Sequence, residues 1–176
     1  MDGSRSDPLT SQYDGPMSEL QRLRAEHAAA ILAFEVSNRS YFTAFISDRG
    51  DDYFNDFAAR FGAELDLQEA GSCILHVAID ESGEVLGRFN LYDVAEGDAT
   101  VGYRVASHAA GRGVATAAVT ELCRLATTHY GLRRLRAATS LENIASQRVL
   151  AKTGFIPVGP AELAGRPGTW YERLLV

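Results

Sequence analysis

Residues 102–116 read GYRVASHAAGRGVAT, and this stretch decides how the rest of the chain is interpreted. A strand-like run over 103–105 leads through a polar turn into Gly111 and Gly113, and an amphipathic helix follows at once. The two glycines permit a positive φ and a close approach of the backbone. The free N–H groups at the start of the helix, together with the helix dipole, then converge on one point. This pattern predicts an anion-binding loop that suits a pyrophosphate.

The spacing excludes the two commonest nucleotide-binding loops. No segment matches the Walker pattern G-x-x-x-x-G-K-[ST]. A Rossmann turn needs G-x-G-x-x-G/A and an acidic residue about 20 positions later. Here Thr116 occupies the sixth position, and the following strand carries Arg133, Arg134 and Arg136 instead of an acid. A glycine-rich turn that merely starts a helix is the alternative interpretation of the loop.

The segment AGRGVA at 110–115 resembles the acyl-CoA pyrophosphate loop of the GNAT N-acetyltransferases, whose pattern is Q/R-x-x-G-x-G/A. Ala110 departs from the first position of that pattern, whereas Gly113 and Ala115 match it. The departure is mild, because backbone N–H groups would provide most of the binding.

A second segment, ENIASQRVLAKTGF at 142–155, is similar to the family pattern N-x-x-S-x-x-x-[LY]-x-x-x-G-F. Its residues most resemble those of the branch of ribosomal-protein-alanine N-acetyltransferases, and the N-terminal segment of the domain resembles that branch too. The resemblance covers roughly residues 18–176. It implies an α+β fold, with a GNAT-like mixed, mostly antiparallel twisted sheet flanked by helices.

The pattern of apolar residues divides the chain in the same way. Residues 1–16 form a polar N-terminal tail without periodicity, and 17–176 are expected to form a single N-acetyltransferase domain. Strands are expected at 18–23, 73–79, 85–92, 99–105, 132–139, 155–158 and 170–176. Helices are expected at 26–37, 51–68, 113–130 and 144–153.

Composition limits the partners. The net charge is -6 and no basic stripe is evident, so we expect no nucleic-acid partner and favour a cationic acceptor. No apolar run reaches about 18 residues and no signal peptide is recognised, so we expect no membrane span and a cytoplasmic location. Cys73 and Cys123 are interpreted as buried core thiols. No metal site is expected.

The resemblance implies acetyl-CoA as co-substrate, with residues 103–105 pairing with the pantetheine amides as an added strand would. Asn143 would lie beside the pantetheine arm, and it is also a good N-cap for the next helix. Ser146 would lie near the cofactor sulfur and could donate to the departing thiolate. The cofactor contacts predicted in this way are Tyr103, Arg104, Val105, His108, Gly111, Arg112, Gly113, Val114, Ala115, Thr116, Asn143 and Ser146. For His108 and Arg112 a solvated turn residue is the alternative.

The general base is the least defined part of the site. Some relatives carry a glutamate five positions before this asparagine, where the present chain has Ala138. Glu162 is the predicted base, because the family folds the corresponding loop over the acceptor. Glu142 is the second candidate, with Tyr92 or Tyr103 bridging through water, and water alone is a further alternative.

The expected activity is therefore acetyl transfer to a primary amine. A protein N-terminal α-amine is the favoured acceptor, and a small amine such as an amino acid, a polyamine or an antibiotic is the alternative. A non-catalytic module that binds acyl-CoA is the rival class, since the missing strand glutamate is compatible with it. For the oligomeric state, the resemblance implies a homodimer as one option.

Overall fold

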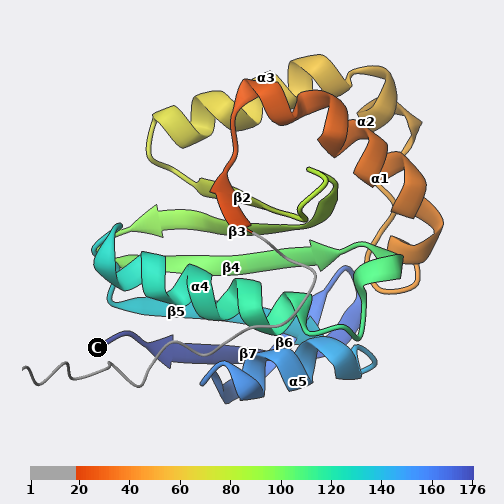
Figure 1. Ribbon diagram of the computed structural model, residues 1–176. Coiled ribbons are helices and arrows are strands. Elements are labelled where there is room, and N and C mark those ends of the chain that lie inside the picture. The colour runs from red at the N-terminus through yellow and green to blue at the C-terminus, as the bar shows by residue number, and fades with distance from the viewer. Residues whose placement is uncertain (1–18) are drawn as a thin grey trace, which may run out of the picture.

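The computed structural model describes residues 19–176, and the polar tail expected at 1–16 lies outside the described residues. One seven-stranded sheet runs through this part of the chain in the order β1-β2-β3-β4-β5-β7-β6 (Figure 1). All neighbouring strands are antiparallel except β4 and β5. The predicted mixed, mostly antiparallel sheet flanked by helices is confirmed.

The elements follow one another along the chain with short connections. The strands are β1 (Glu19–Arg22), β2 (Ile74–Ile79), β3 (Val85–Ala95), β4 (Asp98–Val105), β5 (Arg134–Ser140), β6 (Ile156–Leu163) and β7 (Arg166–Leu174). The helices are α1 (Ala28–Phe42), α2 (Asp51–Asn55), α3 (Phe57–Glu69), α4 (Val114–Thr128) and α5 (Ile144–Lys152), with 3₁₀ turns at Ala25–His27 and Ser107–Ala109. None of the helices within 19–176 is both long enough and apolar enough to cross a membrane.

The sheet splits in its middle. β4 and β5 pair only between Asp98–Thr100 and Arg134–Arg136, at the start of each strand. Beyond these three residue pairs the strands separate, so 101–105 pairs only with β3 and 137–140 pairs only with β7. A gap therefore opens between the two halves of the sheet.

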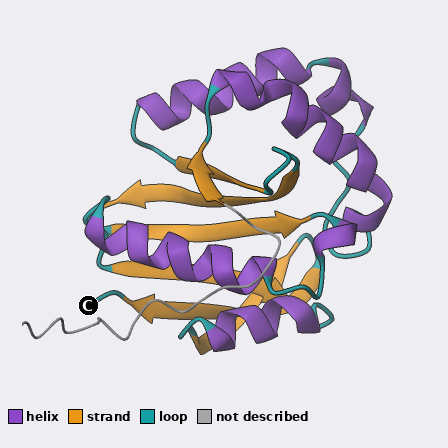
Figure 2. Cartoon of the chain, viewed as in Figure 1, coloured by secondary structure: helices purple, strands orange, loops and turns teal. Residues whose placement is uncertain are grey.

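Helices cover both faces of the sheet (Figure 2). Neighbouring side chains of a strand point to opposite faces, and β3 and β4 show this alternation clearly. Arg88 and Arg104, which are paired in register, reach Glu35 of α1 on one face. Phe89 and Tyr103, the next pair, stack at 5.8 Å and lie toward α5 on the other face. Because both faces are covered, β2 and most of β3 are buried continuously instead of at every second residue.

The apolar core lies between the sheet and the helices on its two faces. Ile31, Phe89, Leu91, Leu122 and Leu135 are completely buried within it. Cys73 and Cys123 are free thiols and buried, as expected.

The largest differences from the expected elements are in three places. The helix expected to end at residue 37 continues to Phe42, because Phe42 packs against Phe34 at 5.4 Å in the core. The helix expected over 51–68 is broken at Asp56, whose φ of -103° and ψ of 20° are not helical. The segment expected to be a loop at 159–169 is mostly strand, since β6 extends to Leu163 and β7 begins at Arg166.

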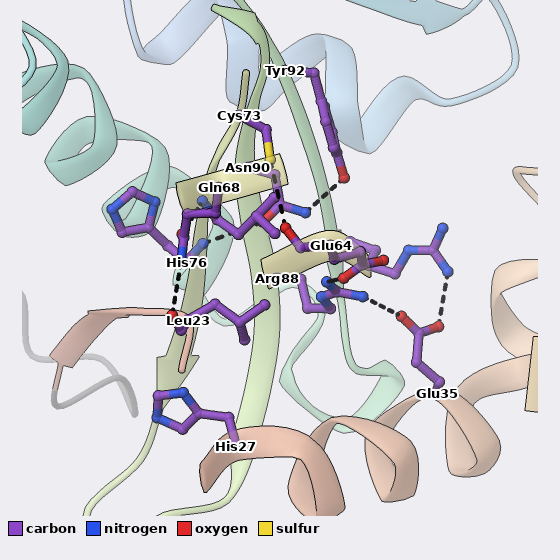
Figure 3. A network of polar contacts seen from close by, with 12 residues as sticks. Leu23, His27, Glu35, Glu64, Gln68, Cys73, His76, Arg88, Asn90 and Tyr92 are labelled. Carbon is purple, nitrogen blue, oxygen red and sulfur yellow. Dashed lines mark hydrogen bonds and ion pairs between the residues drawn. The ribbon is translucent and has the colours of Figure 1, made fainter. Parts of the chain in front are cut away.

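A buried carboxylate joins α1 to the sheet. Glu35 is 1% exposed and accepts from Arg88 at 3.2 Å and from Arg104 at 3.0 Å. It also accepts from Arg49, whose Nε and Nη2 each lie at 3.3 Å. Figure 3 shows Arg88 reaching both Glu35 and Glu64, the second of these at 2.6 Å. The cluster thus connects α1, α3, β3 and β4.

We expect Glu35→Ala to lower the free energy of unfolding by about 3–5 kcal/mol, because it leaves buried guanidinium groups without their counter-charge. Denaturant unfolding followed by circular dichroism measures the change. Glu26→Ala is the matched control, since Glu26 is exposed and pairs only with the exposed Arg24. Equal unfolding midpoints for the two variants would show that the cluster does not stabilise the fold.

Candidate active site

Two cavities meet where β4 and β5 separate. The first, about 410 Å³, lies between the end of β4, the first turn of α4 and one face of α5, and we call it the loop cavity. The second, about 320 Å³, lies between 101–104 of β4 and 137–140 of β5, and we call it the gap cavity. Six residues line both cavities: Phe45, Ile46, Tyr103, Arg104, Asn143 and Ser146.

The glycine-rich loop forms one wall of the loop cavity. Gly111 and Gly113 have φ values of +72° and +82°, which side-chain-bearing residues rarely adopt. Gly113 is the N-cap of α4, and no side chain caps this helix. The N–H groups of its first turn therefore lack intrahelical partners and face the cavity at the positive end of the helix dipole. This backbone fits the pyrophosphate of a coenzyme A thioester.

Most of the predicted cofactor contacts lie together around the loop cavity, and two do not. Its lining includes Tyr103, Arg104, Val105, Gly111, Gly113, Val114, Ala115, Thr116, Asn143 and Ser146. His108 lies outside both linings and approaches Glu84 at 3.5 Å. Arg112 is exposed and also lies outside both.

One face of α5 completes the loop cavity, and the sequence reasoning missed it. Ala145, Arg148, Val149 and Lys152 line the cavity from this helix. Their spacing of three and four residues puts them on a single helical face. The i, i+4 pair of Arg148 and Lys152 was the available signal, because two cations on the face next to an anion-binding loop suit a phosphate-bearing ligand.

Three polar groups are connected at the junction of the cavities. Asn143 caps α5, with its Oδ1 accepting from the Ser146 backbone N–H at 3.1 Å. The Tyr103 hydroxyl lies 2.9 Å from the Ser146 Oγ. Burial raises the pKa of Tyr103 to about 12, although the bond to Ser146 acts in the opposite direction. Tyr103 is therefore protonated at neutral pH.

The carboxylates proposed as general bases lie outside both cavities. Glu162 is in β6 instead of a loop, and its side chain is exposed. Leu163, the next residue, lines the gap cavity, so the alternation of the strand turns Glu162 to the opposite face. Glu142 is exposed and lines neither cavity. Ala138 and Tyr92 do line the gap cavity, and Tyr92 accepts from the Asn90 amide at 2.7 Å (Figure 3).

The lining of the gap cavity contains no Asp or Glu among the described residues, whereas four arginines contribute to it. Within 19–176, no three His, Cys, Asp or Glu side chains gather in a way that could hold a metal ion. The two cavities share the hydroxyl groups of Tyr103 and Ser146, with the glycine-rich loop on one side and the arginine-lined gap cavity on the other.

Comparison with known proteins identifies the family. The acetyltransferase (GNAT) domain matches this chain over residues 19–156. The chain belongs to the GNAT acetyltransferase family. It is an acetyl-CoA-dependent N-acetyltransferase, with acetyl-CoA as its acyl donor.

Individual relatives agree with this assignment. The probable N-acetyltransferase YjcK of Bacillus subtilis is 28% identical over 147 residues, which cover 79% of this chain and 80% of YjcK. The ribosomal-protein-S5-alanine acetyltransferase of Vibrio fischeri has the same fold, with a TM-score of 0.82 at 20% identity over 89% of this chain and 92% of that one. RimJ of Mycobacterium smegmatis, solved with a CoA disulfide, gives a TM-score of 0.79 at 24% identity, covering 88% and 80%.

We expect Gly113→Asp to fold but to bind acetyl-CoA at least about tenfold more weakly, because a carboxylate enters the positive end of α4. Isothermal titration calorimetry measures the dissociation constant. The control is Gly83→Asp, which introduces the same side chain at a φ of +84° with open space around it, outside both cavities. Unchanged binding in the Gly113 variant would contradict the role of the loop.

Proposed function

We propose that this enzyme transfers the acetyl group directly to a protein N-terminal α-amine, with the Tyr103–Ser146 pair protonating the departing thiolate. The observation that carries this proposal is the position of the pair, since both residues line both cavities and their hydroxyl oxygens are 2.9 Å apart. A donor at this junction reaches an acyl donor in the loop cavity and an acceptor in the gap cavity.

The hydroxyl groups of Tyr103 and Ser146 have different roles in the proton transfer. Because the pKa of Tyr103 is about 12, its hydroxyl keeps its proton and can donate to the Ser146 Oγ. The Ser146 hydroxyl then donates its own proton to the thiolate as the carbon–sulfur bond breaks, and Tyr103 reprotonates Ser146. The proton that the attacking amine loses as the carbon–nitrogen bond forms restores the Tyr103 hydroxyl, so the pair ends as it began. Asn143 keeps the start of α5, and with it Ser146, in place through the N-cap bond. The hydrogen bond is needed most in the transition state, when the negative charge on sulfur develops.

The absence of a carboxylate from the gap-cavity lining, as far as the described residues go, favours an α-amine. An α-amine has an ordinary pKa of about 7.7–8.0, against about 10.4 for a lysine-type amine. At neutral pH an α-amine is thus partly deprotonated and can attack without a strong base, while a polyamine depends on one. The S5-alanine enzyme named above has the same fold, and it is an acetyltransferase for a ribosomal-protein alanine.

A free amino acid is the second candidate acceptor. The gap cavity, at about 320 Å³, is within the range of small-molecule sites. An assay of thiol release with both peptides and free amino acids separates the two.

We expect Ser146→Ala to lower kcat by about ten- to a hundredfold, since a hydrogen bond to a charged group contributes about 1.5–3 kcal/mol. The dissociation constant of acetyl-CoA should change much less, because the thiolate exists only late in the reaction. Thiol release and calorimetry measure the two quantities. Equal losses in rate and in binding would reduce Ser146 to a structural contact.

We expect kcat/KM to rise with pH up to the pKa of the acceptor amine and then to stay level to at least pH 10. The rise reflects deprotonation of the amine, and the donor Tyr103 is lost only as the pH passes its pKa of about 12. Glu162→Gln should leave this profile unchanged, because the side chain is exposed on the far face of β6. A pH limb that disappears in Glu162→Gln would instead identify this carboxylate as the base.

A further inference from the structure

We infer that the acceptor carries an anionic group beside its amine, held in the gap cavity by Arg49, Arg88, Arg104 and Arg166. This inference rests on the proposed function and names the chemistry of its acceptor. It replaces the cationic acceptor that the overall charge of -6 suggested, because the local lining of the cavity is opposite in sign to the whole chain.

The charges around the cavity do not balance. Arg49, Arg88 and Arg104 share Glu35, and Arg88 also pairs with Glu64. Three guanidinium groups therefore face two carboxylates, which leaves one positive charge uncompensated. Neither carboxylate lines the gap cavity, whereas all three arginines do.

Arg166 adds a further positive charge from the other half of the sheet. It begins β7, and its Nη1 donates to the Ala44 carbonyl at 3.2 Å. No described carboxylate lies within ion-pair distance of it. Because it approaches from the opposite side of the gap, an anion in the cavity could contact cations from both halves of the sheet.

Arg88 is a buried cation of the gap-cavity lining. Its side chain is 3% exposed, and two of its nitrogens are occupied by Glu35 and Glu64. Its Nε–H is buried and makes no hydrogen bond with any described group. Because this N–H is closed off from the cavity, Arg88 contributes its positive charge to the site and not a free donor.

The electrostatics of Arg104 agree with this. Burial lowers the pKa of Arg104, and the neighbouring charges of Arg49 and Arg88 lower it further against the opposing effect of Glu35. A carboxylate bound in the cavity would relieve this repulsion. Asn90 and Tyr92, which also line the cavity, add neutral hydrogen-bonding groups to the same wall.

The chemical class is a primary amine with a carboxylate within the span of one small cavity. Two sources provide it: a peptide whose N-terminal residue is followed by Asp or Glu, and a free amino acid, whose own carboxylate is next to the amine. A polyamine offers only positive charge and would meet repulsion from the arginines.

Matched acceptor pairs test the inference on the purified full-length chain with acetyl-CoA, by thiol release. One pair is two short peptides identical except for Glu or Gln after an N-terminal Ala. The other pair is alanine and alaninamide, with each kcat/KM expressed per unprotonated amine, and spermidine serves as the cationic acceptor. We expect kcat/KM to be about ten- to a hundredfold higher for the anionic member of one pair. The reason is that its carboxylate forms one or two charge-assisted hydrogen bonds that the neutral member cannot form. A preference in the peptide pair identifies a protein N-terminus as the source, and one in the amino-acid pair identifies a free amino acid.

Arg166→Gln should remove most of that preference, and the loss should be seen in KM for the anionic member. Arg60→Gln is the matched control, because Arg60 is exposed on α3 and lies outside both cavities. If Arg166→Gln does not fold, Arg49→Gln, which changes an arginine that is 28% exposed, tests the same point.

Equal kcat/KM within both pairs, or a higher value for spermidine, would overturn the inference and leave the transferase activity standing. Binding of acetyl-CoA without thiol release for any acceptor would overturn the proposed function as well. A preference that survives in Arg166→Gln and in Arg49→Gln would show that these arginines do not select the acceptor.

Discussion

The buried carboxylate of Glu35 accepts hydrogen bonds from three guanidinium groups, and the arrangement of both cavities depends on it. A carboxylate at 1% exposure is costly unless it is paired and hydrogen-bonded, and Glu35 is paired with residues from β3, β4 and the segment after α1. This fixes α1 against the sheet near the point where β4 leaves β5. Phe45 and Ile46, which follow α1, are thereby placed between the two cavities.

The two cavities present positive charge by different means. In the loop cavity, the backbone N–H groups and the dipole of α4 provide positive charge next to Arg148 and Lys152 of α5. In the gap cavity the charge is on long side chains, which need their own counter-ions to stay in position. Glu35 serves this second purpose too, since it orients the arginines without cancelling all of their charge.

This difference explains how far the sequence could be interpreted. The loop at 111–116 and the Asn143–Ser146 pair act through local geometry, and the structure brings these residues to one cavity as their spacing suggested. The arginine cluster gathers positions 49, 88, 104 and 166, which are distant in the chain, so only the tertiary fold brings them together. The spacing of residues along the sequence therefore does not predict that these four arginines lie together.

Glu162 was misplaced for a related reason. The glycines and prolines of 159–169, beginning with Gly159 and Pro160, suggested a loop, because proline cannot donate to an interior ladder. β6 is however the last strand of the sheet, and an edge strand tolerates proline on its unpaired side. The position of a strand within a sheet is a property of the topology, which periodicity along one segment does not report.

The early separation of β4 from β5 creates two strand edges in the interior of the molecule. An exposed edge on the outside of a protein is a template for foreign strands and a route to aggregation. Here the unpaired backbone at 101–104 and 137–140 lines the gap cavity, whose volume of about 320 Å³ has room for a small ligand and not for a second sheet. A narrow ligand that carries amide groups can form hydrogen bonds with this unpaired backbone. Because these strand edges lie inside a cavity and not on the surface, they favour a narrow ligand over the self-association that an exposed edge permits.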